Sequence, residues 1–146
     1  MYYVNREGIA RRLRCIPELS EASGAIAEGW TGSLLEGLAQ ERCLHLALEI
    51  VTDVGNFLID GFMMRDASSY EDIIDVIAGE GVVPPARAET LRELVALRKP
   101  LVQDYDQWPR REPNRLATEL PALLRAFEED VNAFLKRELE PWESQR

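Results

Sequence analysis

Residues 44–64 read "LHLALEIVTDVGNFLIDGFMM" and form the most apolar stretch of the chain. Three carboxylates interrupt this stretch, Glu49, Asp53 and Asp60, which excludes a membrane span. Their spacing predicts a helix with the charges on one face. On a helical wheel the polar side chains share an arc of about 100°, and the apolar residues cover about 220°. The polar arc consists of Arg42, His45, Glu49, Thr52, Asp53, Asn56 and Asp60.

This apolar arc is about twice as wide as a surface helix needs. We therefore expect the helix to be covered on several sides, by its own bundle and by a second copy of the chain in a homodimer. The polar arc is open to two interpretations. It is either the one solvated face of the helix or the wall of a cleft, and its short His, Thr, Asn and Asp side chains favour the cleft.

Five helical segments are expected along the chain, joined by short connections. They cover about 5–27 (with Pro17 and Gly24 as points of bending or interruption), 33–63, 70–79, 85–108 and 115–139 (with Pro121 as a late start or a kink). Short connections make neighbouring helices antiparallel. The sequence thus predicts an all-α single domain over residues 1–146, an antiparallel up-and-down four-helix bundle with one extra short helix.

Composition narrows the classes of function. Hydrophobic residues make up 46% and charged residues 29%, which is typical of a globular protein. A net charge of −9 argues against a general nucleic-acid coat, so no DNA partner is expected and any RNA contact must be local and short. The start, "MYYVNREGIARRLRC", has no apolar run before its charges and does not resemble a signal peptide. Cys15 and Cys43 are too few for a disulfide framework or a zinc site, so we expect a cytoplasmic protein.

Residues 96–108, "ALRKPLVQDYDQW", continue a helical pattern through two unusual positions. Arg98 lies within the apolar arc, and an unpaired buried guanidinium would cost several kcal/mol. We expect Glu49 or Asp53 to pair with it; the alternative is a side chain that reaches solvent at the edge of the bundle. Pro100 lacks the backbone donor that a regular helix needs, which predicts a break or a wide turn.

Arg98, Gln103 and Tyr105 have the spacing of the motif R-x-x-x-x-H-x-Y of the HepT-like toxins, a branch of the HEPN superfamily of small helical ribonucleases. The segments "MYYVNREGIARRL", "ERCLHLALEIVTDVGNFLIDGFMMRDASSYEDIIDVI" and "LRKPLVQDY" extend the resemblance to its YutE-like branch, over roughly the first three-quarters of the chain. The resemblance implies a HEPN-like four-helix bundle whose dimer joins two motif copies. It also implies cleavage of single-stranded RNA without a metal or another cofactor.

In such a site the histidine transfers protons while the ribose 2′-OH attacks the adjacent phosphate, and the arginine binds that phosphate. The resemblance assigns the phosphate to Arg98. It also implies a nucleotidyltransferase antitoxin as partner, which would silence the toxin by adenylylating the tyrosine at the position of Tyr105.

This sequence departs from the motif at Gln103, because an amide cannot act as a general acid or base. Such catalysis typically contributes about 10²- to 10⁴-fold, so its loss predicts weak cleavage. His45 is the single histidine of the chain. It could substitute only if its helix lines the same cleft as Arg98; otherwise it is a structural or supporting residue. Glu49, Asp53 and Asn56 would support either arrangement.

Three functions are compatible with these residues. The first is a HepT-type endoribonuclease toxin that uses Arg98 with Gln103 or His45, and Tyr105 as its modification site. The second is a non-catalytic HEPN dimer that binds RNA, a nucleotide or a partner protein. The third is a purely structural dimer, and an arginine on an apolar face favours a functional site over it.

Overall fold

The computed structural model describes the backbone of residues 2–143 and the side chains of residues 2–140. Its helices are α1 (Arg6–Leu13), α2 (Ile16–Glu28), α3 (Leu34–Gly61), α4 (Tyr70–Gly79), α5 (Pro85–Ala96), α6 (Arg98–Val102), the 3₁₀ helix η1 (Tyr105–Gln107) and α7 (Arg115–Glu143). No strand occurs in this part of the chain. The protein is therefore all-α, as predicted.

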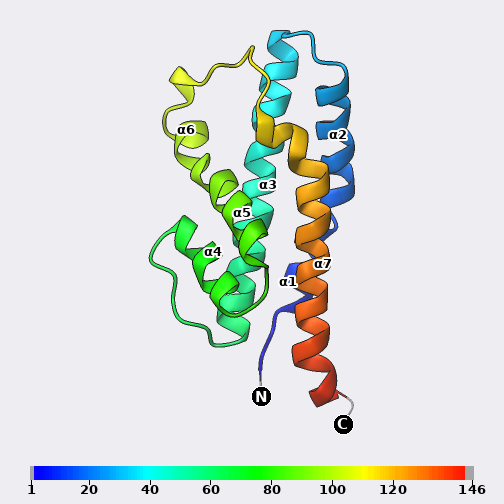
Figure 1. The fold of residues 1–146 in the computed structure, drawn as a ribbon, viewed down its shortest axis with the longest axis vertical. Helices are drawn as coiled ribbons and strands as arrows, with labels where there is room; N and C mark the ends of the chain where they lie inside the picture. Colours follow the sequence, from blue (N-terminus) through cyan, green and yellow to red (C-terminus); the bar gives the residue numbers. More distant parts are fainter. Residues whose placement is uncertain (1, 144–146) are drawn as a thin grey trace.

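Helix α3 is the centre of the molecule and packs against all the other α-helices. Figure 1 shows α2 and α7 on one side of it and α4, α5 and α6 on the other. The four main rods are α1–α2, α3, α5–α6 and α7, with α4 as the extra short helix, which confirms the predicted bundle. Even α3, at 28 residues, is not apolar enough to cross a membrane, and neither is any other described helix.

A single chain covers the apolar arc of α3 more completely than expected. Leu44, Leu48, Val51 and Leu58 have no exposed surface, and within residues 43–62 only Leu46 is an exposed apolar residue, at 36%. The expectation that one bundle cannot cover this arc was therefore wrong. The reason is that α1, α2, α4, α5, α6 and α7 surround α3 on nearly every side.

The first rod is interrupted at Arg14 and Cys15, and Pro17 lies in the first turn of α2. Proline is tolerated there because the first N–H groups of a helix have no intrahelical partner. Gly24 lies inside α2 and does not interrupt it, in contrast to the expectation.

The fourth rod breaks one residue before Arg98. The N–H of Leu97 donates to the carbonyl of Leu94 at 3.1 Å, and the N–H of Leu101 donates to the carbonyl of Leu97 at 2.9 Å. Pro100 is thus the third residue of a new helix, where it needs no donor. The predicted break is confirmed, but the helix does not continue to Trp108, because α6 gives way to η1.

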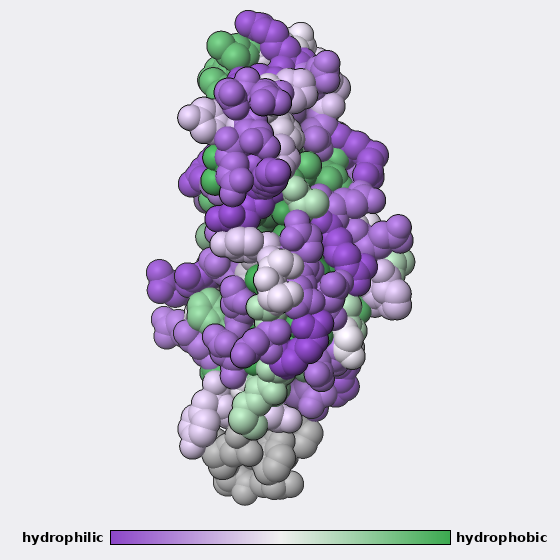
Figure 2. All heavy atoms as spheres, turned by 90° about the vertical axis from the view of Figure 1, so that its left-hand side faces the viewer, coloured by the Kyte–Doolittle hydropathy of each residue, from purple (hydrophilic) through white to green (hydrophobic). Residues whose placement is uncertain are grey.

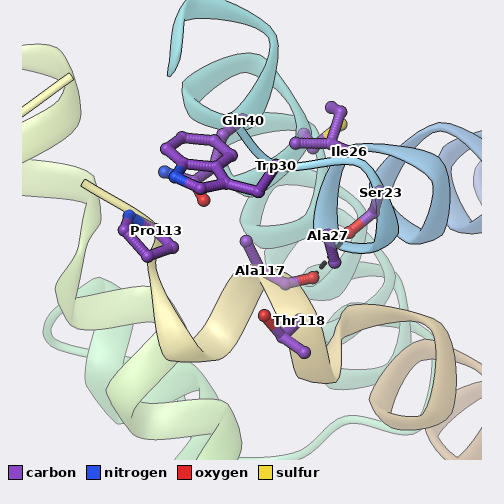
Figure 3. A pocket seen from close by; sticks show the side chains of 9 residues that line it. Ser23, Ile26, Ala27, Trp30, Gln40, Pro113, Ala117 and Thr118 are labelled. Atoms are coloured by element: carbon purple, nitrogen blue, oxygen red, sulfur yellow. Dashed lines mark hydrogen bonds between the residues drawn. The ribbon is translucent and has the colours of Figure 1, made fainter. Parts of the chain in front are cut away.

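Helix α7 runs without interruption through Pro121. Proline cannot donate to the carbonyl four residues earlier, that of Ala117. The hydroxyl of Ser23 in α2 donates to this carbonyl instead, at 2.6 Å in a buried position (Figure 3). In Figure 1 the first turns of α7 lie at an angle to the rest of the helix, in agreement with the predicted kink.

Ser23→Ala is expected to reduce the free energy of unfolding by about 1–3 kcal/mol, because it leaves a buried carbonyl without a donor. Urea unfolding of Ser23→Ala and of wild type measures the loss. In a Pro121→Ala background the new N–H can bond to the carbonyl of Ala117, so the same serine substitution should matter less. Equal losses in both backgrounds would contradict this account.

One face of α3 holds the segment that follows the motif. A Cβ placed on Gly37 would lie 1.8 Å from the carbonyl oxygen of Arg110, so this contact requires glycine. The buried side chain of Gln40 donates to the carbonyl of Glu112 at 3.0 Å and accepts from the N–H of Asn114 at 2.9 Å. Residues 110–114 are therefore anchored to the centre of the bundle.

Candidate active site

Arg98 is the first residue of α6 and is half-buried. Its guanidinium carbon lies 4.0 Å from the ring centroid of Tyr70, the first residue of α4. The Nε atom is buried and has no hydrogen-bond partner among the described residues, whereas the two terminal nitrogens are not buried. The side chain therefore offers its terminal nitrogens to solvent and is held from one side by an aromatic ring.

The carboxylates that we expected beside Arg98 pair elsewhere. Asp53 lies 3.4 Å from Nε of Arg12 in α1, and Glu49 lies 3.4 Å from Nε2 of His45. The expectation that Glu49 or Asp53 pairs with Arg98 was therefore wrong. The alternative was an Arg98 side chain that reaches solvent at the edge of the bundle. The half-buried side chain and accessible terminal nitrogens of Arg98 agree with this alternative.

Arg98 differs from the other half-buried arginines of residues 2–140. Four of the five pair with carboxylates: Arg12 with Asp53, Arg87 with Asp130, Arg92 with Asp75, and Arg110 with Glu41. The fifth is Arg98, for which no ion pair is found in the described residues. In a chain with 26 acidic and 17 basic residues, this leaves one partly desolvated positive charge available for an external anion.

Gln103 and Tyr105 lie close behind this arginine in the chain. Gln103 caps the C-terminus of α6; its N–H donates to the carbonyl of Lys99 at 2.8 Å and its side chain is exposed. Tyr105 begins η1 and is 58% exposed. Because α6 packs against η1, the three motif residues share one short surface segment. Figure 2, which views the molecule from the side of α4 and α6, shows a mainly hydrophilic surface with separate small hydrophobic areas.

An ion pair outside the motif holds the position of Tyr105. Nη2 of Arg110 donates to the carbonyl of Tyr105 at 3.0 Å, and its Nε lies 3.0 Å from Oε2 of Glu41 in α3. Burial raises the pKa of the Glu41 carboxyl, and the positive charge of Arg110 opposes this rise. Sequence analysis missed both residues, as it missed Tyr70, since no local pattern links positions so far apart in the chain.

His45 makes its contacts within α3. Its Nδ1 lies 3.3 Å from Nη1 of Arg42, and its Nε2 faces Glu49. Arginine can only donate, so Nδ1 accepts in the contact with Arg42. In the described part of the chain no hydrogen bond joins His45 to a motif residue. Its role as a substitute catalyst therefore stays a prediction.

The polar arc of α3 borders a groove, but not one formed by the motif. Glu49 and Asp53 are among the residues that line a groove of about 550 Å³ between α3 and the α1–α2 rod, and none of its lining residues comes from α6. Asn56 is exposed, whereas Thr52 is buried and its hydroxyl donates to the carbonyl of Leu48 at 2.9 Å. Thr52 is thus not part of a solvated or ligand-facing surface.

The structure is thus an all-helical bundle with an accessible arginine just after a helix break, followed by Gln103 and Tyr105. The sequence family described as Ribonuclease HepT-like matches residues 12–129, and the chain belongs to this family.

The sequence and the solved structure of one relative support this assignment. The chain is 37% identical over 141 residues to the Bacillus subtilis (strain 168) protein named "Putative RNase YutE", covering 97% of this chain and 96% of the relative. The solved structure of YutE, described as a cytosolic protein of unknown function, matches with a TM-score of 0.82 at 35% identity, over 95% of this chain and 96% of that one. These matches confirm the resemblance to the YutE-like branch.

A more distant structure shares the fold. It is described as a toxin–antitoxin with AMP-PNP and matches with a TM-score of 0.69 at 14% identity, over 88% of this chain and 98% of that one. At this identity the match shows the fold alone.

Proposed function

We propose that this protein is a HepT-type endoribonuclease, the toxin component of a toxin–antitoxin system, which cleaves single-stranded RNA slowly and without metal. Its family is described as "Ribonuclease HepT-like", and its relative is named "Putative RNase YutE". The observation that carries the proposal is the Arg98 guanidinium, the one half-buried arginine of the described residues without a carboxylate partner.

In the proposed reaction the terminal nitrogens of Arg98 bind a phosphate of the RNA. The ribose 2′-oxygen attacks the phosphorus, its proton passes to water, and the bond from phosphorus to the 5′-oxygen breaks. The products are a 2′,3′-cyclic phosphate and a 5′-hydroxyl, which takes up a proton from water. Gln103 can orient the phosphate or a water molecule but cannot carry the proton, and therefore the reaction is slow.

A second function, a non-catalytic dimer that binds RNA, a nucleotide or a partner protein, is favoured by a specific observation. Gln103 is the exposed residue at the expected proton-transfer position, and the single histidine contacts Arg42 and Glu49 instead of the motif. Both functions use the same contact between Arg98 and an anion, and they differ in whether the RNA is cut.

Arg98→Ala tests this shared contact. We expect it to weaken binding of single-stranded RNA by about 10- to 100-fold, the equivalent of one or two lost hydrogen bonds to a charged group. The free energy of unfolding should change by only about 1 kcal/mol, since no carboxylate loses its partner. Fluorescence anisotropy at one fixed salt concentration and urea unfolding measure the two effects.

The matched control is Arg125→Ala, which removes the same charge from an exposed position on α7. It should leave RNA binding within about twofold of wild type after correction for long-range charge. Equal binding by Arg98→Ala and Arg125→Ala would exclude Arg98 as the RNA contact. A large loss of stability in Arg98→Ala would show instead that the arginine is a structural residue.

We also propose a homodimer, which the sequence analysis predicted as well. The proposed interface is now formed by other residues than the apolar arc on which that prediction was based. Leu34, Leu35 and Leu38 at the start of α3 are exposed, Leu35 at 78%. A combined Leu35→Glu and Leu38→Glu variant is expected to raise the dimer dissociation constant at least about tenfold, because it removes apolar burial from both copies. Met63→Glu, at the opposite end of α3, is the control. A wild-type monomer at micromolar concentration in sedimentation equilibrium would contradict the proposal.

The proposed partner protein is a nucleotidyltransferase antitoxin. The proposed location is the cytoplasm, because the relative YutE is described as a cytosolic protein. The exposed Tyr105 side chain is a sterically open acceptor for adenylylation. Intact-mass spectrometry of wild type and Tyr105→Phe after co-expression with such an enzyme tests the modification. Addition of AMP to both proteins would exclude Tyr105 as the acceptor.

A further inference from the structure

Tyr70 lies outside the motif but contacts its arginine. Its ring centroid is 4.0 Å from the guanidinium carbon of Arg98, well within the ~6 Å range of cation–π contacts. Tyr70 is also 40% exposed, so the pair lies at the surface. Residues 71–97 separate Tyr70 from Arg98 in the chain. The two side chains meet because α4, α5 and α6 pack on α3 and on one another.

The start of α4, which carries the Tyr70 ring, is held by hydrogen bonds. The hydroxyl of Ser69 accepts from the N–H of Asp72 at 3.0 Å and caps the helix. The Asp72 carboxylate accepts from Nη1 of Arg65 at 2.8 Å and from the N–H of Ser68 at 2.9 Å. Both bonds lower the pKa of Asp72, the bond from Arg65 most of all, so the carboxylate is charged at neutral pH and the network persists.

Contact with a ring differs from contact with a carboxylate in what it leaves free. A carboxylate partner would neutralise the guanidinium and occupy its donors. A ring holds the cation by its face and accepts none of the hydrogen bonds that lie in the guanidinium plane. Since Nε of Arg98 is buried and the terminal nitrogens are not, the only edge that remains for a ligand is the one formed by these two nitrogens.

We propose that Tyr70 is a positioning residue, whose ring holds the Arg98 guanidinium so that its two terminal nitrogens face an RNA phosphate. This inference rests on the proposed function. Tyr70 acts through Arg98 and does not itself bind the RNA. Its aromatic ring, and not its hydroxyl, is the part that matters.

A double-mutant cycle in RNA binding tests the inference. Tyr70→Leu should weaken binding of single-stranded RNA by about 3- to 30-fold, the range to which cation–π energies correspond. Tyr70→Phe keeps the ring and should bind within about twofold of wild type. In the Arg98→Ala background Tyr70→Leu should have no further effect, since its only route to the RNA has been removed. Tyr3→Leu, the loss of an exposed tyrosine in the N-terminal segment, is the matched control.

A second readout needs no RNA. The Nε–H resonance of Arg98 should be displaced by the ring current in wild type and in Tyr70→Phe, and should move toward its ordinary position in Tyr70→Leu. Thermal unfolding of each variant identifies any that fail to fold. An undisplaced wild-type resonance would contradict the contact between the ring and the guanidinium.

The outcomes separate this inference from the proposed function. If Tyr70→Leu and Arg98→Ala have additive effects on RNA binding, Tyr70 contacts the RNA directly and the inference is wrong while the proposed function stands. If Tyr70→Phe binds as weakly as Tyr70→Leu, the hydroxyl is the active group and the inference is also wrong. A wild-type protein that binds no RNA would contradict both the inference about Tyr70 and the proposed function.

Discussion

Gln103→His is expected to raise RNA cleavage by about 10²- to 10⁴-fold over wild type in the presence of EDTA. An imidazole titrates near neutral pH and can both accept and donate a proton, which the amide cannot. The side chain of Gln103 is exposed at the end of α6, so a ring fits there without displacing packed atoms. The assay uses single-stranded RNA and examines the products for 2′,3′-cyclic phosphate ends.

The control for this gain is Gln107→His, the same substitution at an exposed position in η1. It should cleave no faster than wild type, and Gln103→His should lose its gain when Arg98→Ala is added. Strong wild-type cleavage that disappears in His45→Ala would contradict the role we assign to Gln103 and move the catalytic base to α3. If none of these proteins cleaves RNA, the non-catalytic binding function applies.

Gly37→Ala and Gly24→Ala are expected to change stability in opposite directions. A Cβ on Gly37 would lie 1.8 Å from a backbone oxygen, so the segment carrying Arg110 must move. We expect this movement to reduce the free energy of unfolding by about 1–3 kcal/mol. A Cβ on Gly24 meets no atom within 4 Å, and alanine should stabilise α2 by about 0.5–1 kcal/mol. Urea unfolding should therefore separate the two variants by about 1.5–4 kcal/mol.

The same pair of variants tests whether α3 positions the motif. Arg110 donates to the carbonyl of Tyr105, so displacement of Arg110 also displaces η1. Gly37→Ala should thus weaken RNA binding in conditions where the protein is still folded, whereas Gly24→Ala should not. Equal stabilities for the two variants would mean that the contact at Gly37 relaxes without effect on the segment.

Several features of the fold are decided by local sequence. The periodicity of residues 44–64 predicts α3, because burial of one face at 3.6 residues per turn is a property of the helix alone. The break before Arg98 follows from Pro100, which tolerates only the first turn of a helix. The composition around Ser69 likewise predicts the start of α4. Each of these effects depends on residues within about one or two helical turns of one another.

The neighbours of the site residues depend on packing between helices. A helical wheel gives the angle between two side chains on one helix, but not which face of the next helix they meet. Arg98 was therefore assigned to Glu49 or Asp53, while the packing of α4 on α3 and α5 brings Tyr70 to it. The motif itself could be recognised from the sequence, because its members lie within eight consecutive residues. The residues that hold the motif in place come from distant segments and could not be recognised in this way. The contacts of Arg110 with Glu41 and Gly37 join positions about seventy residues apart, and only the tertiary structure determines which distant residues meet.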